Sequence, residues 1–171
     1  MDFNAYLDKF QKAAGQLDKK KLRQKQMEVA VGIILNSVYL KLYKNSWANP
    51  GEPALTSRSR IFFSIWINDP AIKEEKIFYN IHAFKLRQLK GYTIQSRKFA
   101  SAFRQRFKDL EQQWPNLSVD FGPLTLMEGW IKTDPVNLQT QLLGLASNFL
   151  EAAQLIDDTL TKFRQPGYEL L

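Results

Sequence analysis

The sequence contains no cysteine and a single histidine, His82. Without cysteine the chain has no disulfide framework, no thiol nucleophile and no thiolate ligand for zinc or an iron–sulfur cluster. One histidine cannot build a multi-histidine metal site, and neither an HExxH motif nor a zinc-finger spacing is present. We therefore expect no metal site and no cofactor, and carboxylates are the only remaining candidate metal ligands.

Long apolar runs and export signals are also missing. The longest apolar stretch, residues 29–35 with a looser extension to residue 40, is shorter than the roughly 20 residues that a membrane span needs. The first ten residues carry acidic groups and lack a basic leader followed by an apolar stretch. These absences predict a cytoplasmic protein with no export signal and no membrane partner.

Catalytic motifs are absent as well. The sequence has no GxGxxG, no GxxxxGK[ST] and no GxSxG motif. Carboxylates with a neighbouring lysine, as in metal-dependent nucleases, occur at Asp69, Glu74, Glu75 and Lys76, but all four lie in or beside one predicted loop. Asp120 and Glu128 would converge only on facing strands. We expect no catalytic residue, and a carboxylate- or metal-dependent hydrolase or nuclease is the third alternative.

What is present is enough for one folded domain. The chain has 171 residues, of which 44% are apolar, and it shows no internal repeat and no change of composition that requires two domains. A chain of this size buries a sizeable core without metal or disulfide support. The sequence predicts a single domain over residues 1–171.

Apolar spacing predicts four helices. Apolar residues recur every three or four positions over 2–17, 19–44, 96–113 and 135–163. Ser96 is expected to cap the third of these helices, and Asp134 with Pro135 to start the fourth. In the fourth helix, an apolar stripe with a seven-residue repeat favours packing on a sheet over a coiled coil with a second copy; its members are Leu142, Phe149, Ile156 and Phe163.

Alternating side chains predict strands over residues 60–67 and 76–89, joined as a hairpin, and further strands within 116–132. Helices and strands do not alternate regularly, so the pattern is typical of an α+β domain with a small antiparallel sheet packed by helices 19–44, 96–113 and 135–163. Five hairpin residues share one face: Phe62, Trp66, Phe78, His82 and Phe84. Such a face either stacks on unpaired bases or belongs to the core. With helices available for both faces, the core is favoured, and His82 is interpreted as a hydrogen-bonded, partly buried side chain.

The net charge of +7 is unevenly distributed. The first 108 residues carry 21 basic and 8 acidic groups, whereas the last 63 carry 3 and 9. Residues 85–108 alone carry 8 basic groups and no acidic one. Cations at the start of the helix at 96 and anions at its end oppose the helix dipole, and a locally unfavourable pattern of this kind indicates a function. The candidate polyanion-binding residues are Lys85, Arg87, Lys90, Ser96, Arg97, Lys98, Arg104 and Lys108.

Three interpretations of this basic segment remain open. In the first, it is a solvated face or pairs with the acidic residues Glu151, Asp157 and Asp158 of the last helix. In the second, it meets an external polyanion, foremost a nucleic acid, and the protein is a non-enzymatic binding or accessory domain. In the third, the protein is a homo-oligomeric interaction module in which the basic region of one copy contacts the acidic helix of another. A second basic group at residues 19–25 is interpreted as a solubilising surface.

Overall fold

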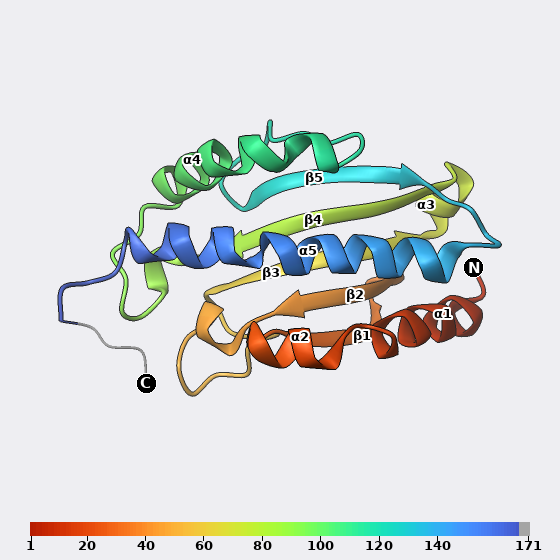
Figure 1. Cartoon of the computed structure of the whole chain (residues 1–171), viewed down its shortest axis with the longest axis horizontal. Helices are drawn as coiled ribbons and strands as arrows, with labels where there is room; N and C mark the ends of the chain where they lie inside the picture. The colour runs from red at the N-terminus through yellow and green to blue at the C-terminus, as the bar shows by residue number, and fades with distance from the viewer. Residues whose placement is uncertain (168–171) are drawn as a thin grey trace.

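The computed structural model describes residues 1–167, which form a five-stranded antiparallel sheet packed by helices (Figure 1). The strands lie in the sheet in chain order: β1 (Glu28–Ile34), β2 (Ser37–Tyr43), β3 (Arg60–Asn68), β4 (Lys76–Phe84) and β5 (Thr125–Lys132). The helices are α1 (Phe3–Gly15), α2 (Lys19–Gln24), α3 (Asp69–Lys73), α4 (Ser96–Phe107) and α5 (Leu138–Thr161). The predicted α+β fold class is confirmed.

The longest helix, α5, crosses the middle of the sheet (Figure 1). The Phe149 ring is fully buried, with its centroid 4.7 Å from the ring centroids of both Phe63 on β3 and Trp114. Leu142 and Ile156, one repeat before and after it, are also buried. The stripe with the seven-residue repeat therefore packs on the sheet of its own chain, as predicted.

A glycine in β5 makes room for a buried tyrosine. Tyr79 on β4 pairs across the strands with Gly129, and its hydroxyl donates a hydrogen bond to the carbonyl of Pro115. A Cβ atom at Gly129 would overlap the tyrosine hydroxyl. This close approach explains a glycine in the interior of a strand.

The predicted helix over 19–44 is wrong. After the short α2, the chain forms the β1–β2 hairpin, in which Ile34 pairs with Ser37. The two residues of the turn, Leu35 and Asn36, have φ angles of 47° and 60°, as a two-residue type I′ turn requires. Val38, Leu40 and Leu42 alternate along β2 and are buried in the core, and Val29 and Val31 of β1 pack against the same core.

The other predicted elements differ mainly at their ends. The predicted hairpin is confirmed as β3 and β4, although β4 ends at residue 84. Within the predicted strand region 116–132, residues 125–132 form β5, and Ser118 makes a single bridge to Glu128. The helix over 96–113 is α4 followed by a 3-10 segment. Both predicted helix starts are wrong. Gln95 is the N-cap of α4, and no side chain makes a capping hydrogen bond there. α5 begins after Asn137, and Asp134 accepts a hydrogen bond from that residue's side chain instead.

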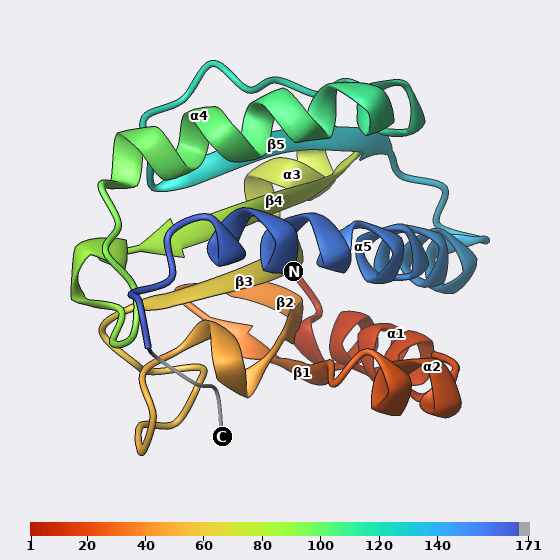
Figure 2. The ribbon, with the colours of Figure 1, turned by 60° about the vertical axis from the view of Figure 1, so that its left-hand side comes forward.

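All the long helices lie on one side of the sheet. Figure 2 shows α1, α4 and α5 on the same side, and the one aromatic ring of α5, Phe149, contacts Phe63 and Tyr79 on the side of the sheet that faces it. We call the opposite side the open face; its central residues are Tyr39, Lys41, Arg60, Phe62, Ser64, Trp66, Phe78, Asn80, His82, Phe84, Glu128 and Trp130. Within residues 1–167, no helix combines the length and the apolar character that crossing a bilayer demands.

Candidate functional site

The basic residues of the segment 85–108 fall into two groups. Lys85, Arg87 and Lys90 are exposed in the connection that follows β4. Arg97 and Lys98 are exposed in the first turn of α4, and Lys108 directly follows that helix. Because an α-helix rises 1.5 Å per residue, Arg97 and Lys108 lie about 16 Å apart along the axis. The helix cations are therefore spread along the length of α4.

Arg104 is committed to the fold. Its guanidinium donates hydrogen bonds to four backbone carbonyls at distances of 2.9–3.0 Å. Two belong to the loop before β5, Phe121 and Gly122, and two to the start of β5, Thr125 and Leu126. Burial lowers the pKa of Arg104 from its ordinary value. Ser96 is half-buried at the first position of α4. Arg97 and Arg104 line a pocket of about 310 Å³ with Ala100 and the loop.

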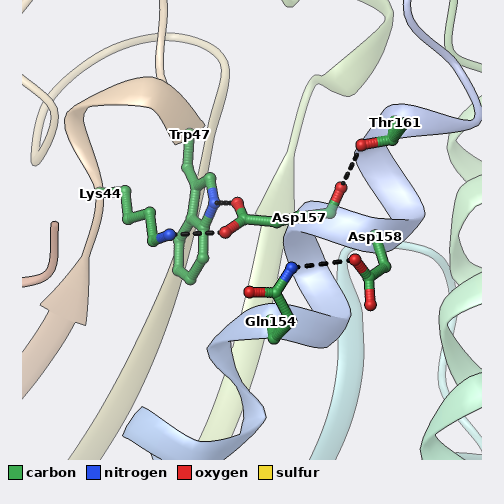
Figure 3. Close-up of polar contacts among 6 residues, drawn as sticks. All are labelled: Lys44, Trp47, Gln154, Asp157, Asp158 and Thr161. Carbon is green, nitrogen blue, oxygen red and sulfur yellow. Dashed lines mark hydrogen bonds and ion pairs between the residues drawn. The ribbon is translucent and has the colours of Figure 1, made fainter. Parts of the chain in front are cut away.

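The acidic residues of α5 pair elsewhere. Figure 3 shows the Asp157 carboxylate between two donors: Lys44 Nζ at 2.5 Å and Trp47 Nε1 at 2.8 Å. Glu151 forms an ion pair with Lys21 at 2.5 Å, and this hydrogen bond lowers the pKa of Glu151.

Asp158 accepts a hydrogen bond from Gln154 at 2.9 Å (Figure 3). Across the part of the chain that the structure describes, no residue of 85–108 has a carboxylate within 4.0 Å of its cationic nitrogens. The expectation that α5 neutralises the basic segment is wrong.

A row of aromatic side chains crosses the open face. Cross-strand pairing places Tyr39 beside Trp66, Trp66 beside Phe78, and Phe78 beside Trp130. All four are half-buried, and the Trp66 and Phe78 rings stack with centroids 4.7 Å apart and planes 13° apart. We call these four residues the aromatic row.

A polar row runs beside the aromatic row. It contains Lys41, Ser64, Asn80 and Glu128, which are cross-strand neighbours in that order. Ser64 and Asn80 are 5% and 2% exposed. Asn80 Nδ2 donates to Glu128 Oε1 at 3.1 Å, whereas Asn80 Oδ1 is buried with no hydrogen-bond partner among the described residues.

Lys76 Nζ lies 4.5 Å from the Trp130 ring centroid and pairs with Glu74, and two further cations of the open face lie against aromatic rings. Lys41 Nζ is 4.5 Å from the Tyr39 ring centroid and 4.8 Å from that of Phe62. The Arg60 guanidinium carbon is 5.4 Å from the Phe62 centroid and 5.0 Å from that of Phe84. Burial lowers the pKa of Lys41, and the charge of Arg60 lowers it further. Neither cation has a carboxylate partner within residues 1–167, so a bound anion would stabilise both.

His82 lies between aromatic neighbours on the same face. Its ring centroid is 5.3 Å from that of Phe62 and 5.0 Å from that of Phe84, and its Nδ1 is 3.4 Å from Thr125 Oγ1. Burial lowers the pKa of His82; the charges of Lys41 and Arg60 act in the same direction, against a hydrogen bond at the Leu124 backbone.

The lowered pKa of His82 makes stability pH-dependent. In the unfolded chain the imidazole titrates near about pH 6.5, so below that pH the unfolded state binds more protons than the folded one. We therefore expect the free energy of unfolding to fall as the pH drops through about 6.5 towards the lower pKa of the folded state. In His82→Gln this contribution is absent. Urea unfolding at about pH 7.5 and about pH 5 measures the difference. If the free energy of unfolding fell equally between the two pH values in wild type and His82→Gln, the prediction would be contradicted.

The candidate catalytic carboxylates are not brought together. Glu74 forms an ion pair with Lys76 at 3.3 Å, and Asp120 is exposed. Glu128 contacts Asn80 through one carboxylate oxygen. Residues 1–167 hold no group of three or more histidine, aspartate or glutamate side chains arranged to bind a metal ion.

The open face is the feature that the sequence interpretation missed. Phe62 is 5% exposed, with His82, Phe84, Lys41 and Arg60 around its ring. No helix of residues 1–167 covers this face (Figure 2), so the preferred interpretation as helix-covered core is wrong. The predicted helix over 19–44 contains Tyr39 and Lys41, so the sequence did not place them beside the predicted hairpin of residues 60–89. Alternation of Tyr39, Lys41 and Tyr43 against three buried residues was the signal available for β2.

Comparisons with models of protein families, with curated proteins and with solved structures each found no match.

Proposed function

We propose that this protein is a non-enzymatic binding domain that contacts nucleic acid through the basic segment 85–108. The observation that carries the proposal is the lack of counter-charge on that segment. Six of its eight basic side chains are exposed, and none of the eight is in an ion pair within residues 1–167. The acidic groups Glu151 and Asp157 are held by Lys21 and Lys44 instead.

Nucleic acid is the partner that suits several exposed cations on two neighbouring segments of the chain. Phosphates repeat along a strand, so the loop cations Lys85, Arg87 and Lys90 and the helix cations Arg97 and Lys98 can each meet different phosphates of one molecule. Such contacts release counterions from the polyanion, and binding then weakens steeply with salt and depends little on base sequence. A small acidic ligand would engage only one group.

Reversal of the helix cations tests the proposal. In Arg97→Glu/Lys98→Glu/Lys108→Glu, we expect the affinity for a fluorescein-labelled oligonucleotide at low salt to fall at least about tenfold. The slope of log K against log salt should drop by about 2, since each phosphate contact with a single strand contributes about 0.7. Arg104 is left unchanged because it holds the loop before β5. Fluorescence anisotropy over a salt series measures both quantities.

The matched control reverses three cations elsewhere. Lys19→Glu/Lys20→Glu/Arg23→Glu changes the net charge by the same amount on α2, where all three side chains are exposed. We expect a much smaller loss of affinity from it. Equal losses in the two triple variants would mean that only net charge matters, and no binding by the wild type at low salt would refute the proposal.

A homo-oligomer is the second candidate, favoured by one observation. β1 is an edge strand with no charged residue after Glu28, and the end of its hairpin exposes Ile33, Ile34 and Leu35, the last of these 91% exposed. Apolar edge strands of this kind pair readily with other chains. Charge attraction between copies has less support, because Glu151 and Asp157 are already paired within the chain. Light scattering across a salt series distinguishes assembly by charge from assembly by strand pairing.

A further inference from the structure

We propose that the open face of the sheet binds single-stranded nucleic acid, with unpaired bases stacking on the aromatic row Tyr39, Trp66, Phe78 and Trp130. The inference rests on the proposed function and deepens it, since it names the class of nucleic acid and a second surface that holds it. The bases occupy the sheet, and the phosphates meet the neighbouring cations.

The first argument is the accessibility of the rings. All four residues of the aromatic row are half-buried, and no helix lies over them (Figure 2). Stacking on aromatic side chains requires a base that is not already stacked and paired in a duplex, so this surface selects single strands. The row also extends over β1, where Gly32 leaves room for the Tyr39 ring; a Cβ atom there would lie 2.7 Å from Tyr39 Oη.

The second argument is charge. Lys41 lies against Tyr39 of the aromatic row and against Phe62, and Arg60 lies against Phe62 on the same face. Neither has a carboxylate partner in the described chain, and a bound phosphate would supply the missing anion. Phe84 of the open face directly precedes Lys85, so the loop cations begin where the sheet ends.

Charge also bears on a second copy of the chain as the occupant. In a two-fold interface, residue i of one copy contacts residue j of the other, so Lys41 can meet Glu128. The central residues of the open face include one acid, Glu128, against two cations, and Glu128 already accepts a hydrogen bond from Asn80. Two such faces bring together more cations than carboxylates, whereas a polyanion supplies an anion for each cation.

The third argument is the unused hydrogen-bonding capacity of the polar row. Asn80 Oδ1 is buried, without a partner in the described chain, on the same face as the rings. Buried polar atoms are normally paired, so an unpaired one next to an accessible surface points to a ligand that completes it. Base edges and sugar hydroxyls carry the donors that an amide oxygen accepts.

Tryptophan fluorescence tests where the bases lie. The chain has four tryptophans, of which Trp47 and Trp114 are 0% and 3% exposed, so quenching by an added oligo(dT) reports on Trp66 and Trp130. We expect oligo(dT) to quench the wild type and a duplex of the same length not to. Trp66→Phe/Trp130→Phe keeps aromatic rings for stacking, so we expect it to retain binding by anisotropy while losing the quenching. Quenching that persists in this variant would overturn the inference.

Affinity gives the second readout. We expect Trp66→Ala and Trp130→Ala each to weaken oligo(dT) binding about tenfold, since one base stacked on an aromatic ring is worth about 1 to 3 kcal/mol. The matched control is Tyr6→Ala, a half-buried aromatic residue on α1 at the other side of the sheet, which should bind normally. Circular dichroism checks that each variant is folded.

The outcomes separate the two proposals. If single and double strands bind equally and the alanine variants bind as wild type while the α4 triple variant does not, the open-face inference is overturned and the proposed function stands. If no nucleic acid binds, both are overturned. If light scattering shows a dimer that Trp66→Ala dissociates, the face is a self-interface and the inference is likewise overturned.

Discussion

Phe149→Ala is expected to lower the free energy of unfolding by about 3 to 5 kcal/mol. Its ring is fully buried, stacks on Phe63 with centroids 4.7 Å apart, and meets Trp114 and Tyr79 at 4.7 and 6.3 Å. Truncation removes the contact between α5 and the sheet at its centre. The cavity is lined by large rings fixed by their own neighbours, so the site cannot collapse to fill it.

Chemical denaturation measured by circular dichroism tests this expectation. Phe121→Ala is the matched control, because it deletes the same side chain from a position that is 38% exposed. We expect the control to change stability by about 0.5 kcal/mol or less. A similarly small change in Phe149→Ala would contradict the placement of α5 over β3 and β4.

The second large effect is expected at Asp157. Its carboxylate accepts hydrogen bonds from Lys44 Nζ and Trp47 Nε1, and the Lys44 side chain is 10% exposed. Asp157→Ala leaves a buried ammonium and a buried indole N–H without their acceptor. We expect the free energy of unfolding to fall by about 3 kcal/mol. This value is at the lower end of the range for breaking a buried ion pair, because the Asp157 side chain is 30% exposed.

Asp158→Ala is the matched control for Asp157→Ala. It removes the same charge from the next residue, whose carboxylate contacts only Gln154 within the described chain. The stability of Asp157→Asn should lie between those of the two alanine variants. Its amide oxygen still accepts a hydrogen bond from Trp47, but the neutral amide no longer balances the charge of Lys44. Equal denaturation midpoints for Asp157→Ala and Asp158→Ala would show that the contacts with Lys44 and Trp47 contribute nothing to stability.

Elements with one clear period were predictable from the sequence. α4 carries Phe99, Phe103 and Phe107 on one stripe, and all three are buried as that spacing indicates. The β3–β4 hairpin alternates along both strands, and its connection begins at Asn68, which caps α3. In these segments, local pattern and tertiary packing agree.

The β1–β2 hairpin was not predictable in the same way. Its apolar residues fit both helical spacing and strand alternation, and its turn uses Leu35-Asn36 instead of the Asn-Gly pair that marks such turns. Leucine with a positive φ is uncommon, so the local signal for a turn was missing. Pairing with β3 decides the structure of this segment.

Two features of the candidate site depend on contacts between distant parts of the chain. The ion pairs Lys21–Glu151 and Lys44–Asp157 join residues 130 and 113 positions apart, and they determine which cations remain unpaired. Whether a face of the sheet is covered depends on where α1, α4 and α5 pack. Neither the long-range ion pairs nor the covering of a sheet face can be predicted from a short segment of sequence. The basic segment could be found by counting charges, whereas Lys41 and the aromatic row could not be joined to it.

The place of α5 at the end of the element order has a consequence for synthesis. Chains emerge from the ribosome N-terminus first, so all five strands appear before the helix that covers them. Until about residue 161 has emerged, Phe63, Ile65 and Ile81 lack their cover on one side, while the aromatic row lies bare on the other. The nascent sheet then exposes apolar side chains on one side and aromatic rings on the other, and exposed apolar surface of this kind favours aggregation. The hydrophobic core is therefore completed only when α5 packs on the sheet.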